Sequence, residues 1–534
     1  MKIQNKRTVI FLPLLLAVFL VGGMLIGNLL SRISRLDQFQ VHPRTNKITG
    51  VIDYIAEEYV DSIDKTSLVE HTIPEILKQL DPHSVYIPAE ELQQYNEPLE
   101  GNFSGIGVQF NMQDDTVVII NTVPNGPSEK VGIIPGDRIV EVDDSLVAGI
   151  NMPSSDIVKM LKGKRGTKVK VSIGRRGLDE LIDFEITRDR IPLTSIDVAY
   201  MITDEIGFIK ISTFSKTTFD EFTEAVSTLK EQGLKKLILD LRNNGGGYMD
   251  AATQIADQFL EPGKLIVYTE GRAQPRRDVY STSKGSLIND KAIILIDEWS
   301  ASASEILAGA IQDNDRGLII GRRSFGKGLV QQQTVFTDGS ALRLTIARYY
   351  TPTGRCIQKP YENGLEDYFH DLQTRFDRGE FIEVDSIKLA DSLKYKTPGG
   401  NIVYGGGGIM PDIFVPYDTL GITSYLTHIR NRGLIYRFAL KYTDTHRNEL
   451  NQFQSAEDIS AHLDQQDLLT DLVEFAEKNG VNRNVEEIII SEKIIMTQLK
   501  AYIARNIIDN EGFYPIIQDI DLTLQKGIEI LAQQ

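Results

Sequence analysis

Residues 291–312 read KAIILIDEWSASASEILAGAIQ, and this stretch decides the architecture of the central part of the chain. Its apolar run from Ala292 to Ile296 predicts a buried strand, and Glu305 to Gln312 predicts a helix that begins after a cluster of serines. The same alternation occurs on the N-terminal side, with strands expected at 207–211 and 237–241 and helices at 219–229 and 250–259. Strands that alternate with helices predict a mainly parallel sheet covered by helices. A further strand is expected at 342–346.

The serine cluster lies where the predicted strand gives way to the helix. A hydroxyl there is close to free backbone N–H groups and to the positive end of the helix dipole, which favours negative charge that develops near a serine nucleophile. Serine is also the usual N-cap residue, and this structural interpretation stays open from the segment alone. The three candidates are Ser300, Ser302 and Ser304.

A second segment, residues 321–331, reads GRRSFGKGLVQ. Lys327 lies between two glycines, and a lysine desolvated by its surroundings is able to act as the base for a serine. The chain has no histidine between residues 200 and 350, so a Ser-His-Asp triad within this region is not available. A surface lysine in a turn is the alternative.

The same segment resembles a phosphate-binding loop, G-x-x-x-x-G-K. The next residue is Gly328 rather than Ser or Thr, so the usual magnesium ligand is missing. Residues 329–336 also have the composition of a strand, where such a loop would lead into a helix. Nucleotide binding is therefore disfavoured.

A third segment, residues 239–247, reads LDLRNNGGG. Three glycines after a buried strand expose backbone N–H groups and let another chain approach closely, which suits an oxyanion hole. A plain turn from strand to helix is the alternative. We expect Asp240 and Arg242 to be structural rather than an acid and a base.

Residues from about 100 to 190 change to short strands separated by glycines and turn residues, with strands expected at 117–120, 139–142 and 169–173 and a short helix at 157–161. Near its start, Gly105-Ile106-Gly107-Val108 forms a glycine-flanked loop that leads into a strand. Such a loop is able to hold a terminal carboxylate with its N–H groups while the strand pairs with the peptide. An ordinary hairpin is the alternative.

The N-terminal segment from Val9 to Leu30 is apolar and uncharged, and it is long enough to cross a bilayer. Basic residues flank it, with at least as many on the short N-terminal side, so that end is expected in the cytoplasm and the rest outside it. A cleaved signal peptide is the competing interpretation, although the run is long for one and no clean cleavage site follows.

Composition limits the remaining possibilities. The 534 residues carry a formal net charge of −17, which disfavours nucleic-acid binding. The single cysteine, Cys356, has no partner for an internal disulfide, and no Cys/His cluster indicates a zinc site. Residues 48–80 and those after about 420 have helical patterns, and neither contains a motif for chemistry.

Taken in order, these segments resemble the C-terminal processing peptidases, also called tail-specific proteases, over residues 45–415. Further similarity lies at 80–84 (LDPHS), 350–355 (YTPTGR) and 404–409 (YGGGGI). The resemblance implies a PDZ-like domain, a Ser-Lys dyad and no cofactor. It does not explain the chain after about residue 420.

The resemblance also implies a role for particular residues. Ser302 would be the nucleophile, Lys327 the general base and Gln331 the residue that orients the lysine, with 25 positions between serine and lysine. The oxyanion hole would use the N–H of Ala303 and of Gly245 or Gly246. The loop Gly105, Ile106, Gly107 and Val108 would hold the substrate's C-terminus, and Ile157 and Leu161 would line the groove.

The predicted organisation is a multidomain α/β protein. We expect a cytoplasmic tip and membrane anchor (1–30), a helical region (31–98), a PDZ-like domain (99–190), a mixed α/β peptidase core (191–418) and a helical C-terminal extension (419–534). The expected function is that of a single-pass bacterial membrane endopeptidase that acts outside the cytoplasm, for example in the periplasm. Its substrates would be proteins with apolar C-terminal tails. A non-catalytic, membrane-tethered PDZ adaptor is the alternative, and an adaptor partner or a second copy of the chain is left open.

Overall fold

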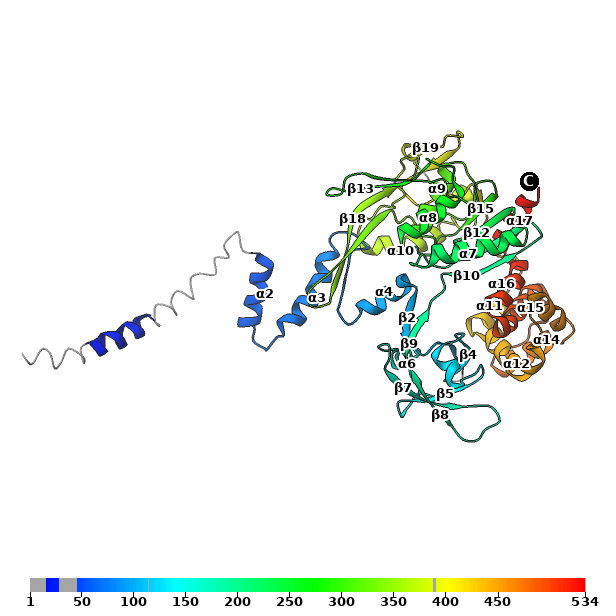
Figure 1. Ribbon diagram of the computed structural model, residues 1–534, viewed down its shortest axis with the longest axis horizontal. Coiled ribbons are helices and arrows are strands. Elements are labelled where there is room, and N and C mark those ends of the chain that lie inside the picture. The colour runs from blue at the N-terminus through cyan, green and yellow to red at the C-terminus, as the bar shows by residue number, and fades with distance from the viewer. Residues whose placement is uncertain (1–15, 28–45, 114, 388–389, 534) are drawn as a thin grey trace, which may run out of the picture. The chain divides into compact units, whose positions relative to one another are not determined.

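The computed structural model describes residues 16–27, 46–113, 115–387 and 390–533 (Figure 1). The chain divides into two compact units, residues 1–80 and 81–534. In the first unit the expected helices are confirmed as α2 (Lys47–Glu58) and α3 (Lys65–Leu77). The carboxylate of Asp64 caps α3 by accepting hydrogen bonds from two backbone N–H groups of its first turn.

The predicted anchor falls only partly within the described residues. Residues 16–27 are helical, and the rest of the Val9 to Leu30 run lies outside the described part of the chain. Within the described residues, no helix is both long enough and apolar enough to cross a bilayer.

The β-rich region from about 100 to 190 forms its own sheet and core, as the sequence predicts (Figure 1, cyan to teal). Its sheet has the order β3–β4–β5–β7–β8, so β3 is an edge strand with one side not paired to another strand of the sheet. A two-stranded ladder of β2 and β9 joins this region to the rest. The elements are β2 (Asn102–Gly105), β3 (Val108–Gln113), β4 (Thr116–Thr122), α5 (Pro127–Val131), β5 (Arg138–Val142), β6 (Ser145–Leu146), α6 (Ser154–Leu161), β7 (Lys168–Gly174), β8 (Ile182–Thr187) and β9 (Asp189–Pro192).

The central region contains the mainly parallel sheet that the sequence predicts, with the order β10–β11–β12–β15–β16–β21. Only the β10–β11 pair is antiparallel. Helices α7, α8 and α9 bury their apolar faces with one face of this sheet in a single large core. The elements are β10 (Ile196–Met201), β11 (Ile206–Ile211), α7 (Thr218–Glu231), β12 (Lys236–Asp240), α8 (Met249–Phe259), β15 (Lys291–Ile296), α9 (Ala303–Asp313), β16 (Leu318–Gly321) and β21 (Ile413–Phe414).

A second, antiparallel sheet lies beside the first and was only partly expected. The strands predicted after Gly328 and around residue 344 are present as β17 (Leu329–Val335) and β18 (Ala341–Tyr350). Strand β18 also pairs with β1 (Val85–Ile87) and β13 (Leu265–Glu270), and β13 pairs with β14 (Arg277–Tyr280). Strand β1 lies far earlier in the chain than β18. Its pairing with β18 places the turn at Asp81, which comes just before β1, against β18.

The chain after residue 420 is helical, as expected, and most of it forms a separate apolar core. Its last helix, however, packs on the face of the parallel sheet opposite α7–α9, where Leu524 and Leu531 are buried with Ile238 and Ile293. The elements are α11 (Ser424–Asn431), α12 (Leu434–Leu450), α13 (Ala456–Leu463), α14 (Leu468–Lys478), α15 (Val485–Ile508), α16 (Asn510–Ile517) and α17 (Leu522–Gln533).

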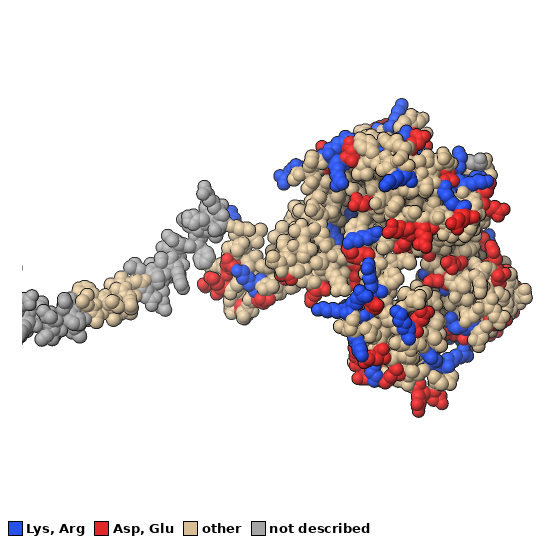
Figure 2. All heavy atoms as spheres, in the orientation of Figure 1, with Lys and Arg blue, Asp and Glu red and all other residues tan. Residues whose placement is uncertain are grey.

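Charge is distributed rather than segregated. On the face shown in Figure 2, Lys and Arg side chains lie among Asp and Glu side chains, and no continuous basic surface covers it.

Candidate active site

A cavity of about 650 Å³ brings together six residues that the sequence predicts for one site. It lies between the carboxyl ends of β12 and β15 and the β17–β18 pair. The predicted residues on its wall are Ser302, Ala303, Gly245, Gly246, Lys327 and Gln331. The predicted loop at Gly105 to Val108 is elsewhere, in the β-rich domain.

The three serines of the cluster have different surroundings. Ser300 and Ser304 are fully buried, and each hydroxyl donates to a backbone carbonyl of the neighbouring strand end, Leu241 O at 2.8 Å and Asn244 O at 2.9 Å. Ser302 is half-buried and is the N-cap residue of α9, where its side chain and that of Glu305 form a capping box. Of the three serines, only Ser302 lies on the cavity wall, where it is able to meet a substrate.

Ser302 also has an unusual backbone conformation. Its φ of 55° and ψ of −111° lie in a region that L-residues rarely adopt. Gly246 lies so close that a Cβ built on it would come within 2.8 Å of Ser302 Cβ. A strained turn from strand to helix exposes a side chain at its apex, and such strain is concentrated at functional sites.

Glu305, in the first turn of α9, joins the serine loop to the lysine loop. Its buried carboxylate accepts hydrogen bonds from the N–H groups of Ser302 (2.9 Å), Gly326 (2.7 Å) and Lys327 (2.8 Å). The Ser324 hydroxyl donates a fourth at 2.5 Å. Burial raises the pKa of Glu305 above its ordinary value, although all four bonds act in the opposite direction. The sequence analysis assigned this residue no role.

Lys327 is largely buried, and its ammonium nitrogen donates to Gln331 Oε1 at 3.2 Å. Burial lowers the pKa of Lys327 below its ordinary value, and the positive charge of Arg343 lowers it further, while Glu305 and Asp81 oppose them. Tyr349 holds the backbone of both loops, because its hydroxyl lies 2.7 Å from Lys327 O and 3.1 Å from Ser302 O. The environment therefore makes the neutral amine easier to reach than it is in a free lysine.

Gln331 is held in place by the turn at residues 81–84, which belongs to the LDPHS segment. The sequence motifs did not assign this turn to the site. Gln331 Nε2 donates to the main-chain carbonyl of His83. The Asp81 carboxylate fixes this turn by accepting from the N–H groups of His83 and Ser84, both at 2.9 Å, and from Thr345 Oγ1 at 3.0 Å. The LDPHS segment thus positions Gln331, which contacts Lys327.

His83 is a second titratable group near Lys327. Burial, followed by the charge of Lys327, lowers the pKa of His83 to about 3, so its imidazole is neutral at ordinary pH. Its Nε2 lies 2.7 Å from the Tyr368 hydroxyl, and the ring is not part of the cavity wall with Ser302. The structure therefore places a histidine close to the lysine but not in contact with the candidate nucleophile.

The glycine turn at residues 245–247 offers unoccupied donors. Gly246 N–H donates to Asn244 Oδ1 at 2.8 Å, so this predicted oxyanion donor already has a partner. Among the described residues, the N–H groups of Gly245, Gly247 and Ala303 have no acceptor. Two segments thus bring free N–H groups to the same cavity.

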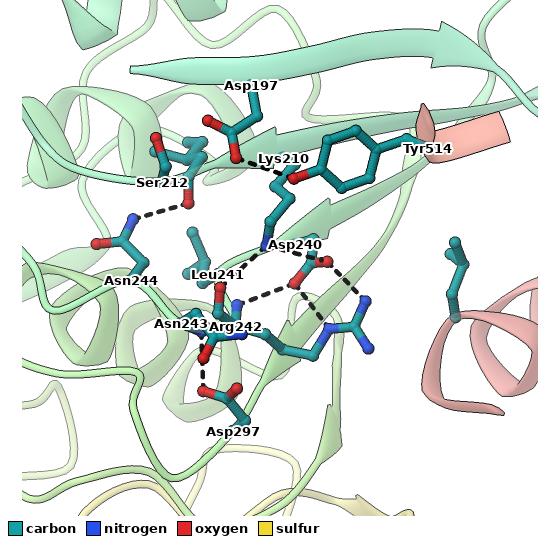
Figure 3. A network of polar contacts seen from close by, with 12 residues as sticks. Asp197, Lys210, Ser212, Asp240, Leu241, Arg242, Asn243, Asn244, Asp297 and Tyr514 are labelled. Atoms are coloured by element: carbon teal, nitrogen blue, oxygen red, sulfur yellow. Dashed lines mark hydrogen bonds and ion pairs between the residues drawn. The ribbon is translucent and has the colours of Figure 1, made fainter. Parts of the chain in front are cut away.

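A network of polar contacts surrounds residues 240–244, which lead into this turn (Figure 3). Arg242 binds both oxygens of Asp240, at 2.9 and 2.7 Å, and both oxygens of Asp521, at 2.8 and 2.6 Å. Lys210 donates to the Arg242 carbonyl at 3.0 Å, and Asn243 N–H donates to Asp297 at 3.0 Å. Asp240 and Arg242 were expected to be structural rather than an acid and a base, and their mutual ion pair is what a structural role needs.

The loop at Gly105 to Val108 has the donors that a carboxylate would need. The N–H groups of Ile106 and Gly107 have no acceptor among the described residues, and Gly107 has a φ of 73°. The Ile106 side chain is only 2% exposed and belongs to the domain core with Ile157 and Leu161, whereas Val108 is partly buried. These side chains form the floor beneath the loop rather than an open groove.

Other reactive groups lie elsewhere. Burial raises the pKa of the Cys356 thiol, which is the opposite of what a reactive thiolate needs. Within the described parts of the chain, no three His, Cys, Asp or Glu side chains come together in a way that could hold a metal ion.

Three family models match the chain. Residues 205–367 match peptidase family S41, residues 104–186 match the PDZ domain, and residues 425–509 match a family of unknown function, DUF8443. The last match covers most of the part that the resemblance did not explain.

Relatives agree with these matches. The carboxy-terminal-processing protease of Bartonella bacilliformis is 34% identical over 350 residues, which cover 64% of this chain and 80% of the relative. The carboxy-terminal processing protease CtpB of Bacillus subtilis is 33% identical over 65% of this chain and 71% of its own length. Among solved structures, the photosystem II D1 C-terminal processing protease is 25% identical over 70% of this chain and 88% of its own, with a TM-score of 0.37.

The fold, the family-model matches and the two curated relatives define a serine-type peptidase with a PDZ domain and a helical C-terminal region. The chain belongs to the carboxy-terminal processing proteases of peptidase family S41. The predicted family and enzyme class are confirmed, and they speak against a non-catalytic adaptor.

Replacing Glu305 by Gln tests whether its carboxylate holds the site together. The amide keeps one acceptor oxygen but turns its NH2 group toward N–H donors, so the two loops should separate. We expect kcat/KM to fall by about 100-fold, because a displacement of about 1 Å at an active site has that effect. Peptide cleavage checks this, with Glu362→Gln, at an exposed glutamate of the peptidase domain, as the control. Wild-type activity in Glu305→Gln would contradict the clamp.

Proposed function

We propose that the chain is an endopeptidase in which Ser302 is the nucleophile and neutral Lys327 the general base. One observation carries the proposal: of the three serines, only Ser302 lies on the wall of the cavity, and it shares that cavity with a half-buried lysine whose pKa is lowered. The two groups are not hydrogen-bonded to each other in this structure, so that bond would form when a substrate is present.

The proposed reaction uses the groups of this cavity in turn. Lys327 takes the proton of Ser302 as Oγ attacks the peptide carbonyl carbon. The N–H of Ala303 and an unoccupied N–H of the glycine turn, that of Gly245 or Gly247, stabilise the oxyanion. Lys327 then gives the proton to the departing amine. Water attacks the acyl ester with Lys327 again as the base, and the acid product leaves. Gln331 orients the lysine throughout.

The PDZ domain would supply the substrate. A free C-terminal carboxylate would accept hydrogen bonds from Ile106 and Gly107 N–H, and the tail would pair with the free edge of β3. This arrangement favours protein substrates with apolar C-terminal tails.

Ser302→Ala is expected to lower kcat/KM by at least about 1,000-fold without unfolding the protein, because it removes the nucleophile. Ser304→Ala is the matched control. It removes one buried hydrogen bond and should lower the free energy of unfolding by about 1 kcal/mol while cleavage continues. Peptide hydrolysis and chemical denaturation measure the two effects. Cleavage at the wild-type rate by Ser302→Ala, with loss in Ser300→Ala or Ser304→Ala, would overturn the assignment.

The pH dependence tests the base. Activity requires the unprotonated amine, so kcat/KM should rise with pH and level off as Lys327 loses its proton, with a midpoint below the ordinary lysine value of 10.5. Lys327→Arg should be as inactive as Lys327→Ala, since arginine keeps its proton. His83→Gln should retain the same rising limb, because His83 is already neutral there. Substantial activity in Lys327→Arg would rule out the proposed role.

Tail recognition is tested with one peptide made as a free acid and as a C-terminal amide. The free acid should have the higher kcat/KM by roughly 10-fold, the contribution of a charge-assisted hydrogen bond. Gly107→Glu should reduce that ratio by repelling the carboxylate. Gly107→Gln is the matched control, because it imposes the same backbone conformation and nearly the same bulk without the charge. A wild-type ratio near one would mean that the PDZ domain does not read the chain end.

We also propose that the run from Val9 to Leu30 anchors the enzyme in a bacterial membrane, with the catalytic domains in the periplasm or otherwise outside the cytoplasm. Its length and lack of charge support this. The protein should stay with membranes washed in alkaline carbonate and keep its original N-terminus. A mature soluble chain that begins after residue 30 would show a cleaved signal instead.

A further inference from the structure

Arg343 lies on the wall of the Ser302–Lys327 cavity without a carboxylate partner. Its Nη2 donates to two amide oxygens, Asn96 Oδ1 at 3.2 Å and Gln333 Oε1 at 2.9 Å. Among the described residues it forms no ion pair, and Nε and Nη1 have no acceptor. The guanidinium carbon also lies 5.9 Å from the centroid of the Tyr95 ring. A guanidinium has five N–H donors, so most of the donors of Arg343 have no acceptor.

Other arginines buried or half-buried in the peptidase domain differ from Arg343. Five of them are paired with carboxylates, and a sixth, Arg316, donates to three backbone carbonyls. The five are Arg242, Arg322, Arg323, Arg355 and Arg375. Arg343 has two neutral acceptors, which leaves its charge uncompensated beside the reaction site.

The strand register gives the position of Arg343 relative to the lysine. On the β17–β18 pair, Gln331 lies opposite Thr345, and Gln333 lies opposite Arg343. Gln331 contacts Lys327 Nζ, and residues two apart on a strand share a face and are separated by about 7 Å. An extended substrate in the cavity covers that distance in about two residues.

The other charges of the cavity do not neutralise Arg343. Glu100 binds Lys216 with both carboxylate oxygens, each at 2.6 Å. Asp250 is exposed in the first turn of α8, and no described cation pairs with it. Lys327 must itself be neutral to act. The wall near Arg343 therefore attracts an anion, and a planar guanidinium binds a carboxylate through two parallel bonds.

We propose that Arg343 forms an anionic subsite that binds a carboxylate of the peptide substrate about two residues from the scissile bond. The proposal rests on the Ser302–Lys327 chemistry proposed above. The carboxylate belongs either to an Asp or Glu side chain or to the chain end of a short tail. In both cases the enzyme selects peptides at the cleavage site itself, independently of the PDZ domain.

The test is a set of peptides in which Asp or Asn is placed at successive positions around one cleavage site. Wild-type enzyme should prefer Asp over Asn by roughly 10-fold in kcat/KM at one position, and Arg343→Gln should bring that ratio close to one. Arg343→Lys should keep part of the preference, and Arg343→Glu should favour Lys over Asn there. The ratio at one fixed pH is independent of any change in Lys327 protonation, because both peptides meet the same enzyme.

Arg348→Gln is the matched control, since Arg348 lies on the same strand but is exposed and not on the cavity wall. It should leave the Asp/Asn ratio as in wild type. A peptide that ends two residues after the cleavage site, made as a free acid and as an amide, distinguishes a side-chain carboxylate from the carboxylate of the chain end. If the preference for the free acid is lost in Arg343→Gln but kept in Gly107→Glu, Arg343 binds the chain end. The opposite pattern means that only the PDZ domain reads the terminus.

Binding separates this proposal from the catalytic one. With Ser302→Ala as a non-cleaving background, fluorescence anisotropy of labelled Asp and Asn peptides should show the same preference, and adding Arg343→Gln should remove it. Equal binding and equal cleavage of Asp and Asn peptides at every position, or an unchanged preference in Arg343→Gln, overturns the subsite. Cleavage by Ser302→Ala would instead overturn the proposed dyad and leave the binding result intact.

Discussion

The carboxylate of Glu305 is the interaction on which the arrangement of the site depends. It accepts backbone hydrogen bonds from Ser302 on one loop and from Gly326 and Lys327 on another. A carboxylate is able to satisfy several donors at once, and leaving buried N–H groups without an acceptor costs about 1–3 kcal/mol each. Separating the two loops would therefore leave several buried groups unsatisfied. The relative position of Ser302 and Lys327 is therefore set by hydrogen bonds from backbone N–H groups, whose positions vary less than those of long side chains.

The parallel sheet brings the remaining groups to the same edge. Strands β12 and β15 are parallel neighbours, so the glycine turn and the serine cluster that follow them are adjacent. The hydroxyls of Ser300 and Ser304 connect the two turns by donating to Leu241 O and Asn244 O. Two of the three serines thus have a structural role, and they hold the strained backbone that exposes the third.

Much of this was predictable from the sequence, because alternating apolar runs specify the parallel sheet and the order of short motifs identifies Ser302 and Lys327. What could not be predicted depends on contacts between distant segments. The carbonyl of His83 binds a side chain 248 residues away, and Asp81 binds one 264 residues away. No local pattern encodes such pairs. The burial of a side chain could not be predicted from its residue type either. Ile106 is apolar, as a residue of a peptide-binding groove would be, but its side chain lies in the domain core.

Both ends of the second unit contribute to one site. The Asp81 turn reaches the lysine through Gln331, and Asp521, close to the C-terminus, completes the ion pairs of Arg242 beneath the glycine turn. Asp240 alone would leave one guanidinium nitrogen, Nη1, without a carboxylate, in a place where burial makes an unsatisfied charged group costly. The helical C-terminal region is therefore coupled to the peptidase domain through the turn that carries the proposed oxyanion donors. The last helix also buries Leu524 and Leu531 against the parallel sheet, so the region beyond residue 420 supplies both a charge and an apolar surface to the peptidase domain.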